Sequence, residues 1–154
     1  MSLDKIYKFQ NGSGSGAFTI GKPIKSGCYG DVLEALVCSC EEKVEKCVIK
    51  FNKNVVDHKR EVKILTNMSD YENFPNMLDH GEIDGKSYIV MERFGTSLTS
   101  HLQENNKREL LSIESTTLIG VQVLKLLEQL HEAGYVHGDL KPDNICVGSY
   151  ANNY

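Results

Sequence analysis

Apolar and polar residues alternate with the period of β-strands in much of the first 94 residues. Such alternation, bounded by turn residues, is typical of half-buried strands. Five stretches follow this pattern: 17–24, 31–38, 47–51, 77–83 and 87–93. A polar, turn-like stretch at 38–46 separates the second from the third, and Asp84-Gly85, a dipeptide typical of tight hairpins, joins the last two. The pattern predicts an antiparallel sheet of five strands.

The period changes to that of a helix at residues 55–68, where apolar residues recur every three or four positions and Pro75 lies beyond the end. A short helix is expected to end at Leu102. The longest helix is predicted over 116–133, and its apolar residues cover more than one stripe, which predicts burial on most sides. A short strand is expected near 145–147. The second part of the chain is therefore mainly helical.

These elements divide the chain into three segments. Residues 1–16 contain the run Asn11-Gly-Ser-Gly-Ser-Gly16 and are expected to be flexible. Residues 17–94 hold the predicted sheet and one helix, and residues 95–154 hold the remaining helices. The fold class predicted is α+β.

Composition excludes several classes of function. The chain has 154 residues and a net charge of −4, so it lacks the basic excess that nucleic-acid binding requires. No apolar run approaches the length of a membrane helix, and the first residues do not resemble a secretory signal. We expect neither nucleic acid nor membrane as a partner.

Five cysteines, an odd number, argue against a disulfide framework. A zinc cluster of Cys38, Cys40 and Cys47 is the alternative to reduced thiols, but its spacing fits no standard zinc pattern. The cysteine usage favours a reducing compartment, the cytoplasm or the nucleus.

The strongest chemical signal is the sequence His137-Gly-Asp-Leu-Lys-Pro-Asp-Asn144, which fits the pattern H-x-D-L-x-x-x-N of a phosphotransfer loop. The alternative is a polar turn after a helix. A second signal is Lys25-Ser-Gly-Cys-Tyr-Gly-Asp-Val32, which matches a glycine-rich phosphate loop except that Lys25 replaces the first glycine. The alternative there is a tight turn.

The third signal is Lys50, which ends an apolar strand run. A lysine there usually points to solvent unless a partner is available. Glu61, 11 residues later on the predicted helix, is such a partner, although the two could also belong to a solvated helix face.

Together these residues resemble a eukaryotic protein kinase over about residues 17–154. Within that superfamily the chain is most similar to the casein kinase 1 group, including the vaccinia-related and tau-tubulin kinases. The closer match is carried by Phe94-Gly-Thr-Ser-Leu98, by His137-Gly-Asp139 and by Cys47-Val-Ile-Lys50. The resemblance implies an N-lobe over 17–94 and part of a C-lobe over 95–154.

The resemblance assigns catalytic roles to five residues. Lys50 would hold the α- and β-phosphates of ATP, and Glu61 would orient Lys50. Asp139 would accept the proton of the substrate hydroxyl, and Lys141 would stabilise the transferring phosphoryl group. Asn144 would bind Mg²⁺, which prefers oxygen ligands.

The resemblance also implies a nucleotide site. Gly27 and Gly30 would allow the loop backbone to close over the phosphates. The remaining residues would line the adenine pocket: Ile24, Val32 and Val48 as its apolar ceiling, Met91 as the gatekeeper, and Glu92 to Phe94 as the hinge.

Besides Lys25, two features depart from the family pattern. Gly138 replaces the arginine that pairs with an activation-loop phosphate in many kinases, and the sequence ends at Tyr154 before any D-F-G segment. The main hypothesis is a serine/threonine protein kinase of the casein kinase 1 type, here an incomplete catalytic domain that phosphorylates protein hydroxyl groups. The alternatives are a truncated pseudokinase that binds a nucleotide, or a partner at helix 116–133, and a small-molecule kinase.

Overall fold

The computed structural model describes residues 5–11, 14–39, 44–104 and 111–148. The chain divides into two compact units. The first comprises Met1–Ser69 and Phe74–Arg93, and the second comprises Asp70–Asn73 and Phe94–Tyr154. Of the elements formed by these described residues, the first unit holds the strands, and the second holds the later helices.

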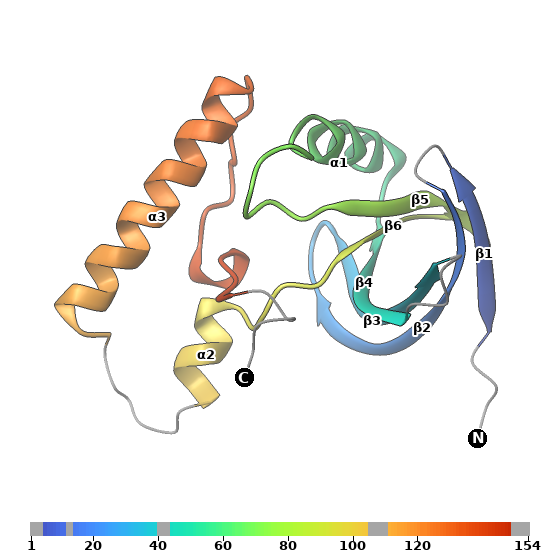
Figure 1. The fold of residues 1–154 in the computed structure, drawn as a ribbon, viewed down its shortest axis with the longest axis horizontal. Helices are drawn as coiled ribbons and strands as arrows, with labels where there is room; N and C mark the ends of the chain where they lie inside the picture. The colour runs from blue at the N-terminus through green and yellow to red at the C-terminus, as the bar shows by residue number, and fades with distance from the viewer. Residues whose placement is uncertain (1–4, 12–13, 40–43, 105–110, 149–154) are drawn as a thin grey trace. The chain divides into compact units, whose positions relative to one another are not determined.

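The first unit is a six-stranded antiparallel sheet with strand order β1-β2-β3-β4-β6-β5 and one helix (Figure 1). The strands are β1 (Ile6–Asn11), β2 (Gly14–Ser26), β3 (Gly30–Ser39), β4 (Val44–Asn52), β5 (Met77–Ile83) and β6 (Lys86–Glu92). Helix α1 (Val55–Asn67) packs against β4, β5 and β6. The α+β class predicted from the sequence is confirmed.

The hairpin between β5 and β6 forms where the sequence predicts it. Asp84 and Gly85 both adopt positive φ, at 51° and 75°, which is the backbone of the type I′ turns that match the twist of a hairpin. Ile83 and Lys86 are the first paired residues on either side. The short-range turn chemistry therefore fixes the register of these two strands.

The prediction of five strands is wrong, because residues within the segment expected to be flexible form β1 and the beginning of β2. Tyr7 and Phe9 alternate with exposed residues along β1, and both rings lie against Phe18 of β2, with centroids 5.4 and 6.4 Å apart. Aromatic contacts of this kind add to the stability that the backbone ladder provides. The added strand thus extends the core.

The core lies on one face of the sheet and is built from alternate residues of β2, β3, β4 and β6. Its buried members are Phe18, Ala35, Val37, Cys47, Ile49, Tyr88 and Val90. Burial raises the pKa of the Cys47 thiol to about 12, so this cysteine is a structural, protonated side chain. Cys40, the third member of the zinc cluster considered above, lies outside the described residues.

Helix α1 begins where the sequence supplies a cap. The side chain of Asn54 accepts a hydrogen bond from the backbone N–H of Asp57 at 2.7 Å, which satisfies one of the donors left unpaired in the first turn. His58 and Leu65 are its buried residues. The helix expected over 55–68 is confirmed.

The second unit contains α2 (Leu98–Glu104), α3 (Ile113–Glu132) and the 3₁₀ turn η1 (Pro142–Asn144). The strand expected near 145–147 is an isolated bridge between Ser97 and Cys146. It is held by backbone bonds from Leu98 N to the Ile145 oxygen at 2.7 Å and from Val147 N to the Thr96 oxygen at 2.9 Å. The pairing is too short to form a strand.

Helix α3 is capped by Ser112, whose hydroxyl accepts a hydrogen bond from the backbone N–H of Ser115 at 3.1 Å. The burial on most sides that its apolar pattern favours is not observed among the described residues. Leu130 is its buried residue, and its large apolar side chains at Ile113, Leu118, Val121 and Leu124 are exposed. Neither α3 nor any other helix within the described residues is long and apolar enough to cross a membrane.

Candidate active site

The predicted pair of Lys50 and Glu61 forms in the first unit. Lys50 Nζ lies 2.7 Å from both Glu61 carboxylate oxygens, so the carboxylate grips the ammonium group with two hydrogen bonds. The side chains are 19% and 27% exposed, which protects the pair from much of the screening that weakens surface ion pairs. The geometry fixes the lysine head group on one side of β4.

Three of the residues predicted to line the adenine pocket share one face of the sheet with Lys50. Val32 pairs with Lys50 across β3 and β4, and Val48 pairs with Met91 across β4 and β6. Directly opposed residues of antiparallel strands project to the same side. Val32, Val48, Lys50 and Met91 therefore share a face.

The other predicted pocket residues are less regularly placed. Ile24 lies at a bulge of β2 between Pro23 and Lys25, and its side chain is 48% exposed. Glu92 ends β6, where its backbone N–H donates to the Asn76 oxygen at 2.9 Å. Phe94 belongs to the second unit. The expected hinge segment thus runs across the boundary between the units.

The glycine-rich loop joins β2 to β3. It is closed by a backbone bond from Gly27 N to the Gly30 oxygen at 3.0 Å and by a hydrogen bond from the Ser26 hydroxyl to Asp31. A Cβ atom on Gly30 would lie 2.3 Å from the Phe51 backbone oxygen, whereas one on Gly27 would meet nothing closer than 3.9 Å. Gly30 is therefore required by the approach of β4, and only Gly27 has open space beside it.

In the second unit, the loop after α3 and the turn η1 bring together three predicted catalytic residues, Asp139, Lys141 and Asn144. Lys141 Nζ donates to the Asp139 carboxylate oxygens at 3.0 and 2.8 Å. Asn144 Nδ2 donates to the Asp139 backbone oxygen at 2.8 Å and to its carboxylate at 3.1 Å. His137 Nδ1 accepts from the Asp139 backbone N–H at 3.2 Å. The loop is thus held by its own polar side chains.

These contacts set the charge of Asp139. The hydrogen bond from Lys141 is the largest influence, and together with the bond from Asn144 it holds the pKa of the Asp139 carboxyl below its usual value. The carboxylate is therefore ionised at neutral pH. Gly138 has a φ of 73°, a conformation in which glycine is unstrained, so this position suits the residue that replaces the family's arginine.

Sequence reasoning missed two residues, Asn52 and His58, that are linked to Glu61 by hydrogen bonds. Asn52 Nδ2 donates to Glu61 Oε2 at 2.8 Å, and the Asn52 oxygen lies 3.1 Å from His58 Nδ1. The signal was available: Asn52 is two residues after Lys50 on the same strand, and His58 is three residues before Glu61 on the same helix. Both spacings place the residues on shared faces.

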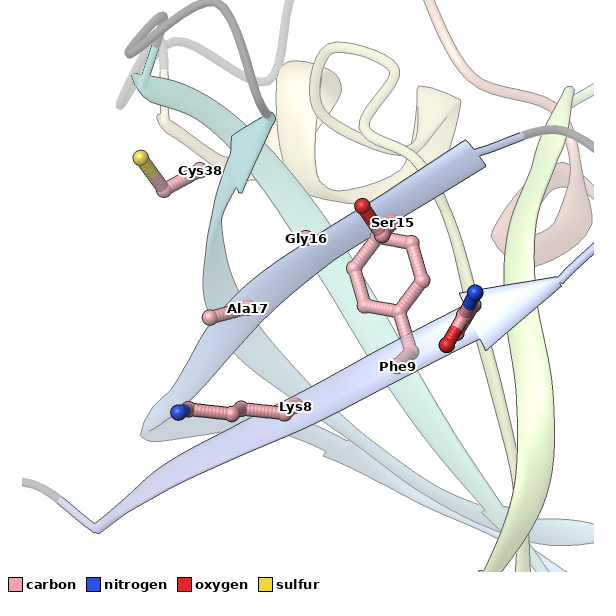
Figure 2. Close-up of a pocket in the computed structure, with 7 residues that line it drawn as sticks. Lys8, Phe9, Ser15, Gly16, Ala17 and Cys38 are labelled. Carbon is pink, nitrogen blue, oxygen red and sulfur yellow. The ribbon is translucent and has the colours of Figure 1, made fainter.

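A separate shallow hollow lies at the outer end of β1, β2 and β3 (Figure 2). It is lined by Lys8, Phe9, Gln10, Ser15, Gly16, Ala17 and Cys38. None of the predicted site residues contributes to it. Within the described ranges, no group of three or more histidine, cysteine, aspartate or glutamate residues is arranged to hold a metal ion.

Comparison with known proteins places these features in a family. The protein kinase domain model matches residues 18–152. A probable casein kinase I homolog of Encephalitozoon cuniculi is 26% identical over 135 residues, which cover 85% of this chain and 41% of the relative. A probable serine/threonine-protein kinase of Dictyostelium discoideum is 28% identical over 133 residues, covering 86% and 27%.

A shorter match adds a third relative. Nucleosomal histone kinase 1 of Drosophila melanogaster is 38% identical over 78 residues, covering 48% of this chain and 13% of the relative. The chain spans less than half the length of each of these three relatives. Because the family model matches most of the chain, and the ion pair and polar loop described above lie within the match, the chain belongs to the protein kinase family.

Proposed function

We propose that this chain carries the nucleotide-binding and phosphotransfer residues of a serine/threonine protein kinase of the casein kinase 1 type, which transfers the γ-phosphoryl group of ATP to a protein hydroxyl. The observation that supports it most is the cluster of Lys141 and Asn144 around the Asp139 carboxylate. The casein kinase 1 assignment rests on the Phe94–Leu98 and His137–Asp139 sequences and on the names of the relatives.

Asp139 is suited to orient a substrate hydroxyl and to receive its proton. Its lowered pKa keeps it ionised at neutral pH, and its bonds to Lys141 and Asn144 fix the position of the carboxylate. Lys141, 2.8 Å from that carboxylate, places a positive charge beside the oxygen that attacks. Phosphoryl transfer depends mainly on such positioning and charge neutralisation.

Lys50 would bind the phosphates of ATP, and Glu61 holds its ammonium group in place by two bonds. Val32, Val48 and Met91 on the same sheet face would contact the adenine. Mg²⁺, when bound, neutralises the phosphates. The side-chain oxygen of Asn144 would provide one ligand to a magnesium ion held mainly by the nucleotide phosphates.

We further propose that the substrate is a protein and that the compartment is reducing. The odd number of cysteines, five, and the buried position of Cys47 agree with such a compartment.

The test is phosphotransfer from Mg²⁺-ATP to a mixed protein substrate by the protein at its native length. Asp139→Asn should lower kcat by at least about a hundredfold, since it removes a general base, while Mg²⁺-ATP still binds. Asp84→Asn is the matched control, because the same isosteric change falls in the exposed β5–β6 turn, where asparagine is favoured.

The wild-type protein and Asp84→Asn should incorporate phosphate equally. Absence of transfer by the wild type, or unchanged transfer by Asp139→Asn, would contradict the proposal. Nucleotide binding without phosphoryl transfer would favour the pseudokinase alternative. Phosphoryl transfer to small molecules but to no protein would favour the small-molecule kinase alternative.

A further inference from the structure

A chain of polar side chains continues from the Lys50–Glu61 pair into the space between β4 and α1. Asn52 and His58 form it, and both are largely buried, at 7% and 9% exposure. Lys50 and Asn52 lie two apart on β4, and His58 and Glu61 lie three apart on α1. Each pair therefore presents two side chains on one face of its element.

The hydrogen bonds fix the orientation of the Asn52 amide. An ionised carboxylate only accepts hydrogen bonds, so the Asn52 group that lies 2.8 Å from Glu61 Oε2 is the NH₂. The amide oxygen then faces His58 Nδ1 at 3.1 Å. His58 must donate this bond, so the neutral ring carries its proton on Nδ1.

The surroundings of His58 agree with a neutral ring. Burial and the neighbouring His80 of β5, whose ring centroid lies 5.9 Å away, lower the pKa of His58, and the Glu61 carboxylate opposes them. A neutral imidazole has one donor, and here the donor is committed to Asn52. The direction of every bond from His58 to Lys50 is thereby determined.

We propose that Asn52 and His58 are positioning residues, which hold the Glu61 carboxylate in the orientation that grips Lys50. This role rests on the proposed function, because it matters for catalysis only if Lys50 binds nucleotide phosphates. Without Asn52, Glu61 Oε2 loses a charge-assisted bond, and the carboxylate is free to rotate away from Lys50. Asn52 acts on Glu61 directly, and His58 acts on it through Asn52.

Two substitutions of His58 separate this role from simple packing. In His58→Asn the side-chain nitrogen can occupy the place of Nδ1 and still donate to Asn52. In His58→Gln the amide instead reaches the place of Nε2, so the bond is lost. If the bond to Asn52 matters, His58→Asn should be the more stable of the two variants. Helix propensity alone predicts that His58→Gln is the more stable, because glutamine is the better helix former. Asn52→Leu removes both bonds of the amide with little change in volume.

The experiment uses the protein at its native length. The imidazole ¹⁵N resonances of His58 report its tautomer, the dissociation constant of Mg²⁺-ATP reports the site, and the urea midpoint reports folding. We expect the Nδ1–H form in the wild type and its loss in Asn52→Leu. His58→Asn should bind Mg²⁺-ATP within about twofold of the wild type. His58→Gln should bind about fivefold more weakly, as expected for one lost neutral bond, and Asn52→Leu about tenfold more weakly, because it also removes the bond to the charged Glu61.

The outcomes distinguish the two proposals. An Nε2–H tautomer in the folded wild-type protein, or equal nucleotide affinity of His58→Asn and His58→Gln, would overturn the positioning role. Failure of the wild type to bind Mg²⁺-ATP would overturn the proposed function instead. The tautomer of His58 would still report whether the hydrogen bonds from His58 to Asn52 and from Asn52 to Glu61 exist.

Discussion

Replacing Gly30 by alanine tests whether this glycine serves the fold or the nucleotide. The alanine Cβ would lie 2.3 Å from the Phe51 oxygen and 3.2 Å from the Phe51 carbonyl carbon, both of them backbone atoms of β4. A backbone carbonyl cannot move aside as a flexible side chain can. The first rung of the β3–β4 ladder, where Gly30 pairs with Asn52, must therefore open.

The size of the effect follows from this overlap. Nonbonded carbon and oxygen atoms rarely approach within about 3.0 Å, so the strands must separate locally by about 0.7 Å. Overpacking of this kind costs about 1–3 kcal/mol, and weakening one ladder hydrogen bond adds about 1 kcal/mol. We expect the free energy of unfolding to fall by about 2–4 kcal/mol.

Gly27→Ala is the matched control in the same loop. Its Cβ would meet only the Gly30 oxygen at 3.9 Å, an ordinary contact, so the free energy of unfolding should change by less than about 1 kcal/mol. Its effect should instead be on the affinity for Mg²⁺-ATP, because a Cβ there obstructs the approach of phosphates to the loop.

Urea unfolding followed by circular dichroism measures both variants, since the chain has no tryptophan to report by fluorescence. With a slope of about 2 kcal/mol per molar, the midpoint of Gly30→Ala should fall by about 1–2 M, and that of Gly27→Ala should stay within about 0.5 M. Equal midpoints for the two variants would refute the reasoning.

Two further predictions concern buried polar groups in the first unit. Tyr88→Phe should lower the free energy of unfolding by about 1.5–3 kcal/mol, because the buried Tyr88 hydroxyl donates to Asp79 Oδ2 at 2.7 Å; an unchanged urea midpoint would contradict this. The pKa of His58 in the folded protein lies below its usual 6.5, so the unfolded chain binds the proton more readily than the folded one. The contribution of His58 to the free energy of unfolding should therefore fall as the pH drops below about 6.5. It should level off once the pH is below the folded pKa. The difference in unfolding free energy between wild type and His58→Asn, measured from pH 7.5 to 5, should therefore shrink as pH falls, and a constant difference would contradict the assignment.

Features whose chemistry is local could be predicted from the sequence. The contacts around Asp139 join residues between His137 and Asn144, so a short sequence contains the whole arrangement. The hairpin at Asp84 and Gly85 is equally local, since two positive φ angles decide it. In both cases the residues that determine the geometry are neighbours in the chain.

Features that depend on contacts between distant segments were harder to predict. The alternation of Tyr7 and Phe9 was visible, but it spans only one strand, and its stabilisation comes from Phe18 on the next one. The glycine- and serine-rich residues that follow favoured a flexible segment. The strand expected near 145–147 failed for a related reason: its apolar residues gain only two backbone hydrogen bonds from the segment at Thr96–Leu98.

The residues around Lys50 show how the two kinds of information combine. The sequence identifies Lys50 and Glu61, and their ion pair then fixes the register of α1 against β4. Once that register is known, periodicity places Asn52 beside Lys50 on the strand and His58 beside Glu61 on the helix. Gly30 shows the reverse case. It matches a phosphate-loop pattern, but the packing of the strands also requires a glycine there, because a Cβ atom would lie 2.3 Å from the Phe51 backbone oxygen. A residue that matches a functional pattern can thus be there for packing, and a residue outside every pattern can support the reaction, so only the contacts separate the two roles.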